Sequence, residues 1–317
     1  MSVFESSMSR RTLGGVALGA AATTGLAYLV SAQDATPSAD EATPETAPTL
    51  AELETVTQIG IAVTNGSFGI YGGSENQPGW FVFQVENGSD ADASFNLAQL
   101  PEGMSVSDFN SAVFKTISGT EVSTFEGVTF AGGTTVAAGG AASVLVNLSA
   151  GEWVIFSAHA ASKQSSTTIK VLTPEETVYM GSEPVATPEG GELAPEGFGS
   201  NFTVSVSESA ISADAMPSAG LNTIGVRNDG SGPANLVVLN STESVDAAAA
   251  VDLAKSWIAG EEVGATVVGG MGVLSPDKYG YFELTVTGGT YIAFSALANA
   301  DGSLQVDGGA IIVVPTM

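Results

Sequence analysis

Residues suited to acid–base or metal chemistry are scarce in this chain. It contains a single imidazole, His159, and no cysteine. His159 by itself would bind a metal ion weakly or act as a general base, and a loop histidine hydrogen-bonded to backbone or solvent is the simpler interpretation. The absence of cysteine excludes disulfides and cysteine nucleophiles. The single histidine excludes zinc or copper sites that need several imidazoles. We therefore predict no cofactor and no metal centre, with His159 as the one candidate ligand.

The serines and carboxylates also lack a catalytic pattern. No Gly-x-Ser-x-Gly elbow precedes the histidine, as a serine hydrolase of the α/β type would require. Close carboxylate pairs occur, but none has the spacing of a calcium loop. These pairs are Asp90/Asp92, Glu175/Glu176 and Glu261/Glu262. The pattern predicts a solvated acidic surface, so we expect no catalytic residue and no enzyme; a carboxylate-based hydrolase and incidental calcium binding are the alternatives.

The charge balance narrows the class of partner. Asp and Glu number 34 against 8 Lys and Arg, which gives a formal net charge of −26. Such acidity disfavours nucleic acid phosphates and anionic membrane surfaces. The aromatic residues best placed to stack on a sugar or to anchor a protein are Trp80, Tyr279 and Tyr281. We expect these three to contact an envelope protein or a glycan, and we expect no nucleic acid partner.

The N-terminal residues have the pattern of a twin-arginine export signal. Arg10 and Arg11 precede an apolar Gly/Ala-rich run at residues 14–30, and small residues follow where a signal peptidase reads. The run is shorter than the roughly 20 strongly apolar residues of a membrane-spanning helix. We predict a signal peptide at residues 1–32, a mature start at Gln33, and export to the periplasm, cell surface or medium without membrane insertion after cleavage. An uncleaved N-terminal anchor is the alternative.

Two stretches rich in Pro, Thr and acid interrupt the apolar pattern. Residues 33–54 and 174–199 hold too little apolar content to bury a core, so we predict disordered linkers there. The segments that follow them, 55–173 and 200–317, each have the length of a domain. The predicted order is signal, linker, domain, linker, domain.

The two predicted domains look like copies of each other, because four short motifs occur in the same order in both. The matched ranges are 81–88 with 222–230, 114–119 with 254–260, 132–133 with 269–270, and 151–158 with 289–296. The shared order indicates duplication. In the second copy the glycine pair continues to Gly272, a spacing typical of a turn.

Hydrophobic periodicity gives the fold class. Alternating apolar residues, such as Phe81/Phe83/Val85 and Phe282/Leu284/Val286, predict short strands in both copies. Each copy also has one candidate helix, at residues 105–117 and 244–258, the first beginning with Ser105 and Asp108 in a capping-box-like arrangement. Trp153 and Tyr291 occupy equivalent strand positions and are predicted to be core. The prediction is an all-β chain of two tandem β-sandwich domains, each with one short helical insertion.

A family resemblance rests on three of these elements. They are the run Leu100-Pro-Glu-Gly-Met-Ser-Val-Ser-Asp-Phe109, the pair Gly132-Gly133, and the strand Gly151-Glu-Trp-Val-Ile-Phe156. Their order resembles that of cupredoxin-like (type 1 copper domain) exported proteins of bacteria, and the resemblance covers most of both copies. It implies two tandem cupredoxin-like domains.

The resemblance also implies where copper ligands would stand. The family's first copper histidine matches Ala93, and its cysteine matches Ser157 and Ser295. No methionine or second histidine occupies the loops before the terminal strands at residues 168–172 and 310–314. A blue copper centre needs two imidazoles and a thiolate. The resemblance therefore implies cupredoxin-like domains that lack the copper ligands.

These observations predict an exported, non-enzymatic binding or structural module of the cell envelope. The alternative is a metal-handling or redox-accessory cupredoxin-like protein with weak, non-thiolate metal binding.

Overall fold

The computed structural model describes residues 49–53, 56–64, 67–72, 76–117, 125–157, 166–172, 195 and 198–315. The predicted signal peptide, residues 33–48, His159, and Glu175 with Glu176 lie outside these ranges. All described residues belong to the compact unit Thr46–Met317. We call residues 49–172 the N-terminal half and residues 195–315 the C-terminal half.

Strands make up most of each half, as the alternating apolar pattern predicts. Those of the N-terminal half are β1 (Thr57–Thr64), β2 (Ser67–Tyr71), β3 (Gly79–Asn87), β4 (Ala93–Gln99), β5 (Thr129–Val136), β6 (Ala141–Leu148), β7 (Gly151–Phe156) and β8 (Ser166–Val171). Those of the C-terminal half are β9 (Phe202–Val206), β10 (Ile211–Ala213), β11 (Gly220–Asn228), β12 (Ala234–Ser241), β13 (Thr266–Leu274), β14 (Tyr279–Val286), β15 (Thr290–Phe294) and β16 (Ile311–Pro315).

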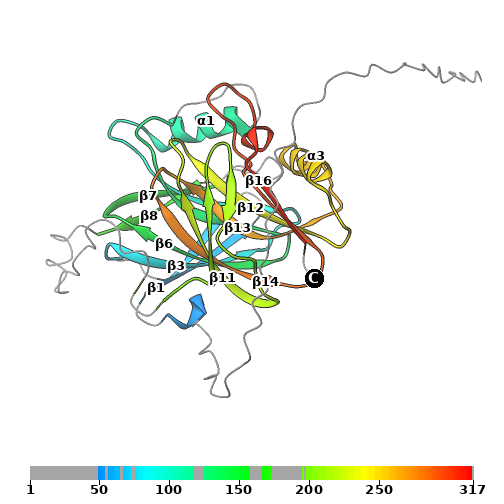
Figure 1. Cartoon of the computed structure of the whole chain (residues 1–317). Coiled ribbons are helices and arrows are strands. Elements are labelled where there is room, and N and C mark those ends of the chain that lie inside the picture. Colours follow the sequence, from blue (N-terminus) through cyan, green and yellow to red (C-terminus); the bar gives the residue numbers. More distant parts are fainter. Residues whose placement is uncertain are drawn as a thin grey trace, which may run out of the picture. The chain divides into compact units, whose positions relative to one another are not determined.

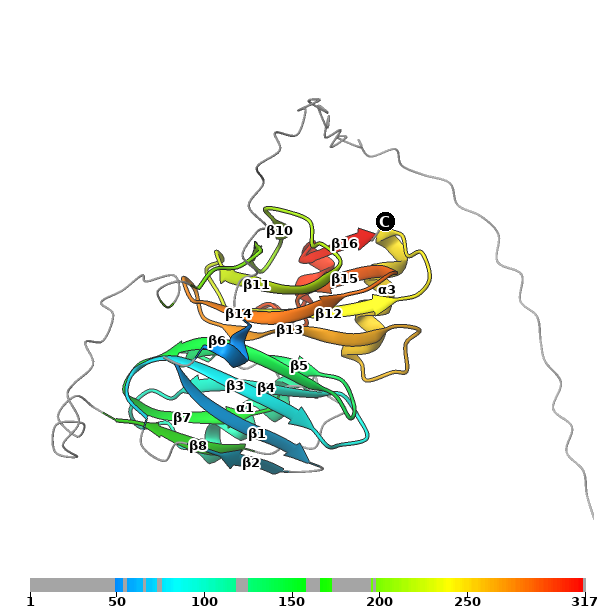
Figure 2. The same cartoon turned by 90° about the horizontal axis from the view of Figure 1, so that it is seen from below.

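Both halves contribute to both sheets (Figure 1). The first sheet has the order β10-β9-β11-β14-β6-β3-β1-β2, and the second has the order β16-β15-β12-β13-β5-β4-β7-β8. Each order reads the same from either end once β9 to β16 are matched to β1 to β8. The halves meet where β14 lies beside β6 and β13 lies beside β5, which Figure 2 shows from a second direction. We call this junction the seam.

The main core lies between the two sheets. Alternate residues of each strand point inward, and the largest cluster of buried apolar side chains combines them from both sheets and both halves. Trp153 and Tyr291 are both buried in this cluster, so the prediction that they are core residues is confirmed.

One helix in each half covers the outer face of the second sheet. Helix α1 (Val106–Ile117) begins after Ser105, whose Oγ accepts the Asp108 amide at 3.1 Å and donates to Asp108 Oδ2 at 2.6 Å. Helix α3 (Ala247–Ile258) begins after Asp246, whose carboxylate accepts two amides of the first turn. The prediction of an all-β fold with one short helix in each half is confirmed.

The sequence pattern places Val251, Ala254 and Ile258 on one apolar face of α3, and the structure buries a different set. Ala250, Ala254 and Trp257 are its buried residues, whereas Val251 is only partly buried. Trp257 packs against Phe294 beneath the helix. The aromatic ring decides the face because it has the most apolar area to bury.

Glycines permit the close approach of strands in the second sheet, both within each half and across the seam. Gly133 and Gly270 have φ of +142° and +147°, and a Cβ there would lie 1.9 Å from Phe95 O and 2.1 Å from Leu236 O, respectively. A Cβ on Gly272 would lie 2.8 Å from Cα of Gly133 in the opposite half. The prediction of a turn at residues 269–272 was wrong: these residues form part of β13, where irregular pairing with β12 produces a bulge.

The N-terminal linker prediction also needs correction at its end. Residues 50–52 form a 3₁₀ turn, η1 (Leu50–Glu52), and Leu50 is fully buried. Phe198, near the end of the second predicted linker, is buried as well. Composition missed both because each segment buries only one or two apolar side chains.

Candidate functional site

The positions that the family resemblance assigns to copper lie at corresponding places in the two halves. Ala93 is the first residue of β4, and Ser157 directly follows β7. In the C-terminal half Ser295 directly follows β15, and the first residue of β12 is Ala234. All four side chains are buried. The fold thus supplies Ala234 as the counterpart of Ala93.

In the N-terminal half, Ser157 belongs to a buried polar group. Its Oγ lies 3.3 Å from Ser94 Oγ, and Asn96 Nδ2 donates to Ser94 Oγ over the same distance. Asn96 Oδ1 accepts the amide of Val273 at 3.0 Å. Because Val273 belongs to β13, this polar group is connected across the seam to the opposite half.

In the C-terminal half, Ser295 lies in a polar group built from its own half. Ser295 Oγ is 3.0 Å from Asn235 Oδ1 and 2.6 Å from Gln305 Oε1. Asn235 Oδ1 also accepts the Ala296 amide, and Gln305 Nε2 donates to the Pro233 carbonyl. Gln305 is held by the 3₁₀ turn η2 (Gln305–Gly308) in the loop before β16.

The chemistry of this second group is that of a closed hydrogen-bond network. The Ser295 hydroxyl has one proton and faces two acceptor oxygens, so it donates to one at a time. Every donor and acceptor is a neutral hydroxyl, amide or carbonyl. Such groups do not fit a type 1 copper ion, which takes a thiolate and imidazoles.

The three aromatic residues singled out from the sequence do come together. Trp80 of β3 lies with its ring centroid 5.5 Å from that of Tyr279 and 5.9 Å from that of Tyr281, both on β14. Because β3 and β14 belong to different halves, the three side chains form an aromatic cluster across the seam on the outer face of the first sheet.

The chain itself covers part of this aromatic cluster. Phe198 meets the Tyr281 ring edge-on at 5.2 Å, and Leu50 packs in the same cluster. Tyr281 is only 7% exposed, and burial raises the pKa of its hydroxyl. Trp80 and Tyr279 are partly buried. Of the three aromatic residues, these last two therefore keep part of their surface exposed.

The carboxylates predicted to form a solvated surface have separate roles in the described part. Asp92 Oδ2 accepts the indole N–H of Trp257 at 3.1 Å, which connects the β3–β4 turn to α3 of the other half. Glu261 and Glu262 are exposed after the end of α3. Among the described residues, no three His, Cys, Asp or Glu side chains gather closely enough to hold a metal ion.

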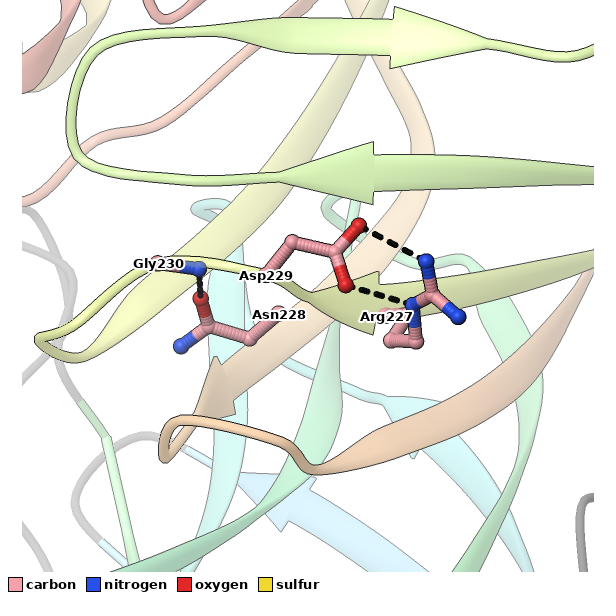
Figure 3. A network of polar contacts seen from close by, with 4 residues as sticks. All are labelled: Arg227, Asn228, Asp229 and Gly230. Atoms are coloured by element: carbon pink, nitrogen blue, oxygen red, sulfur yellow. Dashed lines mark hydrogen bonds and ion pairs between the residues drawn. The ribbon is translucent and has the colours of Figure 1, made fainter.

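A buried asparagine ends the third strand of each half. Asn228 Nδ2 donates to the Leu274 carbonyl at 2.8 Å and its Oδ1 accepts the Gly230 amide, as Figure 3 shows for the latter. Asn87 likewise donates to the Val136 carbonyl and accepts the Ser89 amide. Leu274 and Val136 are the last residues of β13 and β5, so the two turns are tied to equivalent strands.

An ion pair flanks Asn228 at the second of these turns. Arg227 Nε lies 2.5 Å from Asp229 Oδ1, and Nη2 donates to Oδ2 (Figure 3). The hydrogen bond from Arg227 holds the pKa of Asp229 below its ordinary value, and the same bond raises the pKa of Arg227. Both side chains are largely exposed, so the pair contributes little to stability.

Comparisons with known proteins give distant structural similarities. No model of a protein family matches the sequence, and no curated protein sequence does. Auracyanin from Roseiflexus castenholzii is similar at 15% identity over 38% of this chain and 99% of its own, with a TM-score of 0.27. The copper-containing nitrite reductase of Thermus scotoductus is similar at 10% identity over 82% of this chain and 61% of its own, with a TM-score of 0.20.

Blue copper oxidase from Nitrosomonas europaea is also similar, at 7% identity over 82% of this chain and 85% of its own, with a TM-score of 0.22. TM-scores this low support no argument about the present chain.

Within the described part of the chain, neither helix has the length and apolar character needed to cross a membrane.

Proposed function

We propose that this protein is an exported, non-enzymatic binding or structural module of the cell envelope, built on two tandem cupredoxin-like copies that lack copper. The observation that carries the proposal is the hydrogen-bond network of the buried Ser295 and Gln305 with the partly buried Asn235. Neutral groups hydrogen-bonded to one another stand where the family resemblance requires a thiolate and its neighbouring ligands. The scaffold is kept and the metal chemistry is lost.

Matched features in the two halves support the tandem-copy part of the proposal. The strand orders mirror each other, and Asn87 and Asn228 make the same pair of hydrogen bonds at the same turn. Buried serines follow β7 and β15, and buried alanines begin β4 and β12. Agreement between equivalent polar positions favours duplication over convergence on a common sandwich.

The binding role rests on charge and on the aromatic cluster. A net charge of −26 leaves proteins and neutral glycans as the favoured partners, and nucleic acid as a disfavoured one. Trp80 and Tyr279 retain partial exposure beside each other on the outer face of the first sheet. A pair of partly exposed rings gives a protein or a sugar an apolar platform.

Native mass spectrometry of the protein recovered from the envelope and medium of its source tests this function. The proposal predicts a chain starting at Gln33 without bound metal, either alone or with a protein or glycan attached. A stoichiometric copper ion that is lost in His159→Ala would overturn it in favour of the metal-handling alternative. Hydrolysis of a glycan or peptide panel, abolished by one Asp or Glu substitution in a folded variant, would overturn it in favour of an enzyme.

A further inference from the structure

The segment just before β1 lies over the seam of the first sheet. Leu50 is fully buried among Val82 of β3, Leu145 of β6 and Tyr281 of β14. Of these three strands, β6 and β14 are the two that meet at the seam of this sheet, one from each half. One leucine side chain therefore packs on both halves at once.

Polar contacts hold the same segment from both sides. The Leu50 amide donates to Glu283 Oε1 of β14 at 2.7 Å, across 233 positions of sequence. Gln58 Nε2 of β1 donates to the carbonyls of Leu50 and Leu53, each at 3.2 Å. Within the segment, the Thr49 amide donates to the Glu52 carboxylate at 2.9 Å, and hydrogen bonds with Thr49 hold the pKa of Glu52 below its ordinary value.

The seam beneath this segment is a short ladder. Strands β14 and β6 pair over three residues, Gly280 to Phe282 against Val146 to Val144. The neighbouring ladders, β3 with β6 and β11 with β14, each pair over eight residues. The first sheet is thus joined between its halves by fewer hydrogen bonds than hold each half together, and the buried segment crosses that place.

We propose that residues 49–53 are a latch that fastens the two halves of the first sheet across the β6–β14 ladder. Leu50 supplies apolar packing on both halves, while Glu283 and Gln58 fix the backbone of the latch to the C-terminal and N-terminal halves. The proposal concerns how the halves are joined and stands whatever partner the protein binds.

Hydrogen exchange of the full chain, followed by mass spectrometry, tests the latch with matched variants. Leu50→Ala is compared with Leu221→Ala, which removes a half-exposed leucine from β11 of the same sheet. Glu283→Ala is compared with Glu86→Ala, an exposed glutamate of β3. The amides of residues 144–146 and 280–282 report on the seam, and those of the β12–β15 ladder report on the fold elsewhere.

The latch predicts that Leu50→Ala speeds exchange at the seam by about tenfold or more, with little change at β12 and β15. Glu283→Ala should produce a smaller increase at the same amides, and neither control should do so. Unchanged seam exchange in Glu283→Ala and Leu50→Ala would overturn the proposal. So would an equal rise in the β12–β15 ladder, because that result describes general destabilisation. If Leu50→Ala does not fold, the Glu283→Ala comparison decides alone.

Discussion

The two halves share the same order of strands, but the buried serine that follows β7 or β15 has different hydrogen-bond partners in each half. Ser157 belongs to a group in which Asn96 binds the Val273 amide of the opposite half. Ser295 belongs to a group closed by Asn235 and Gln305 within its own half. Register places Asn96 opposite Phe156 and Val237 opposite Phe294, so the apolar Val237 stands where the N-terminal half has Asn96.

Equivalent positions in the two halves therefore have different roles. Asn96 in β4 hydrogen-bonds across the seam, whereas Val237 at the equivalent position of β12 packs beneath α3. Under the proposed copper-free function neither serine has to hold a metal in fixed geometry, which leaves both positions free to diverge.

The largest effect is expected at the matched glycines Gly133 and Gly270. In Gly133→Ala and Gly270→Ala the new Cβ would collide with the carbonyl oxygen of the paired strand, and the positive φ adds strain. Each variant should lose about 3 kcal/mol or more of unfolding free energy, or fail to fold. Urea denaturation measures this against Gly264→Ala, where a Cβ meets open space. A loss below about 1 kcal/mol at either glycine would show that the close approach is not needed.

Removing the polar group at the seam should have the next largest effect. Asn96→Ala leaves the buried Val273 amide without its acceptor, which should cost about 2 kcal/mol, whereas Ser295→Ala should cost about 1 kcal/mol. Hydrogen exchange should rise in β13 for Asn96→Ala and near η2 for Ser295→Ala. An Asn96→Ala effect confined to the N-terminal half would contradict the role of Asn96 in joining β4 to β13 of the opposite half.

The aromatic cluster should show moderate coupling between halves. A double-mutant cycle compares the loss of unfolding free energy in Trp80→Leu/Tyr279→Leu with the sum of the losses in the two single variants. The difference measures the ring contact across the seam. We expect an interaction energy of about 0.5–1.5 kcal/mol from urea unfolding of the four proteins. Strict additivity would mean that the two rings do not stabilise the seam together.

The smallest effect is expected at the Arg227–Asp229 ion pair beside the second turn. Asp229→Asn should cost less than about 1 kcal/mol at neutral pH, because the pair is exposed. The pKa of Asp229 is depressed in the folded protein, so its contribution is present above the ordinary Asp pKa of about 3.9 and lost as pH falls through the lower folded value. The difference in unfolding free energy between wild type and Asp229→Asn should therefore shrink below about pH 4. A difference that grew on acidification would reverse the assigned sign.

Local patterns were enough to predict much of the fold. Alternation at Phe81/Phe83/Val85 gave a strand, and Ser105 with Asp108 gave the start of α1, because each depends on residues close in sequence. The glycine motif at 269–272 was taken for a turn because a bulge needs a partner strand that sequence alone does not place. Leu50 and Phe198 were missed for the same reason: their partners lie far along the chain.

The candidate site was predictable in part. Ala93, Ser157 and Ser295 followed from the family resemblance, and the aromatic residues Trp80 and Tyr279 from their type. Asn235 and Gln305 were missed because no motif links them to Ser295, and only the fold brings them within hydrogen-bond distance. Matching Ala93 with the Ala that starts β12 would have pointed to Asn235, the next residue in the chain.

The most direct test of the central claim is copper titration of the wild type beside Ala234→His/Ser295→Cys/Gln305→His, followed by visible absorption. The triple variant places a thiolate at Ser295 and imidazoles at Ala234, the counterpart of Ala93, and at Gln305, which hydrogen-bonds Ser295. We predict a wild type that binds no stoichiometric copper, and a folded variant that binds one Cu(II) with an intense visible thiolate band. Stoichiometric copper on the wild type, or a folded variant that stays colourless, would contradict the account.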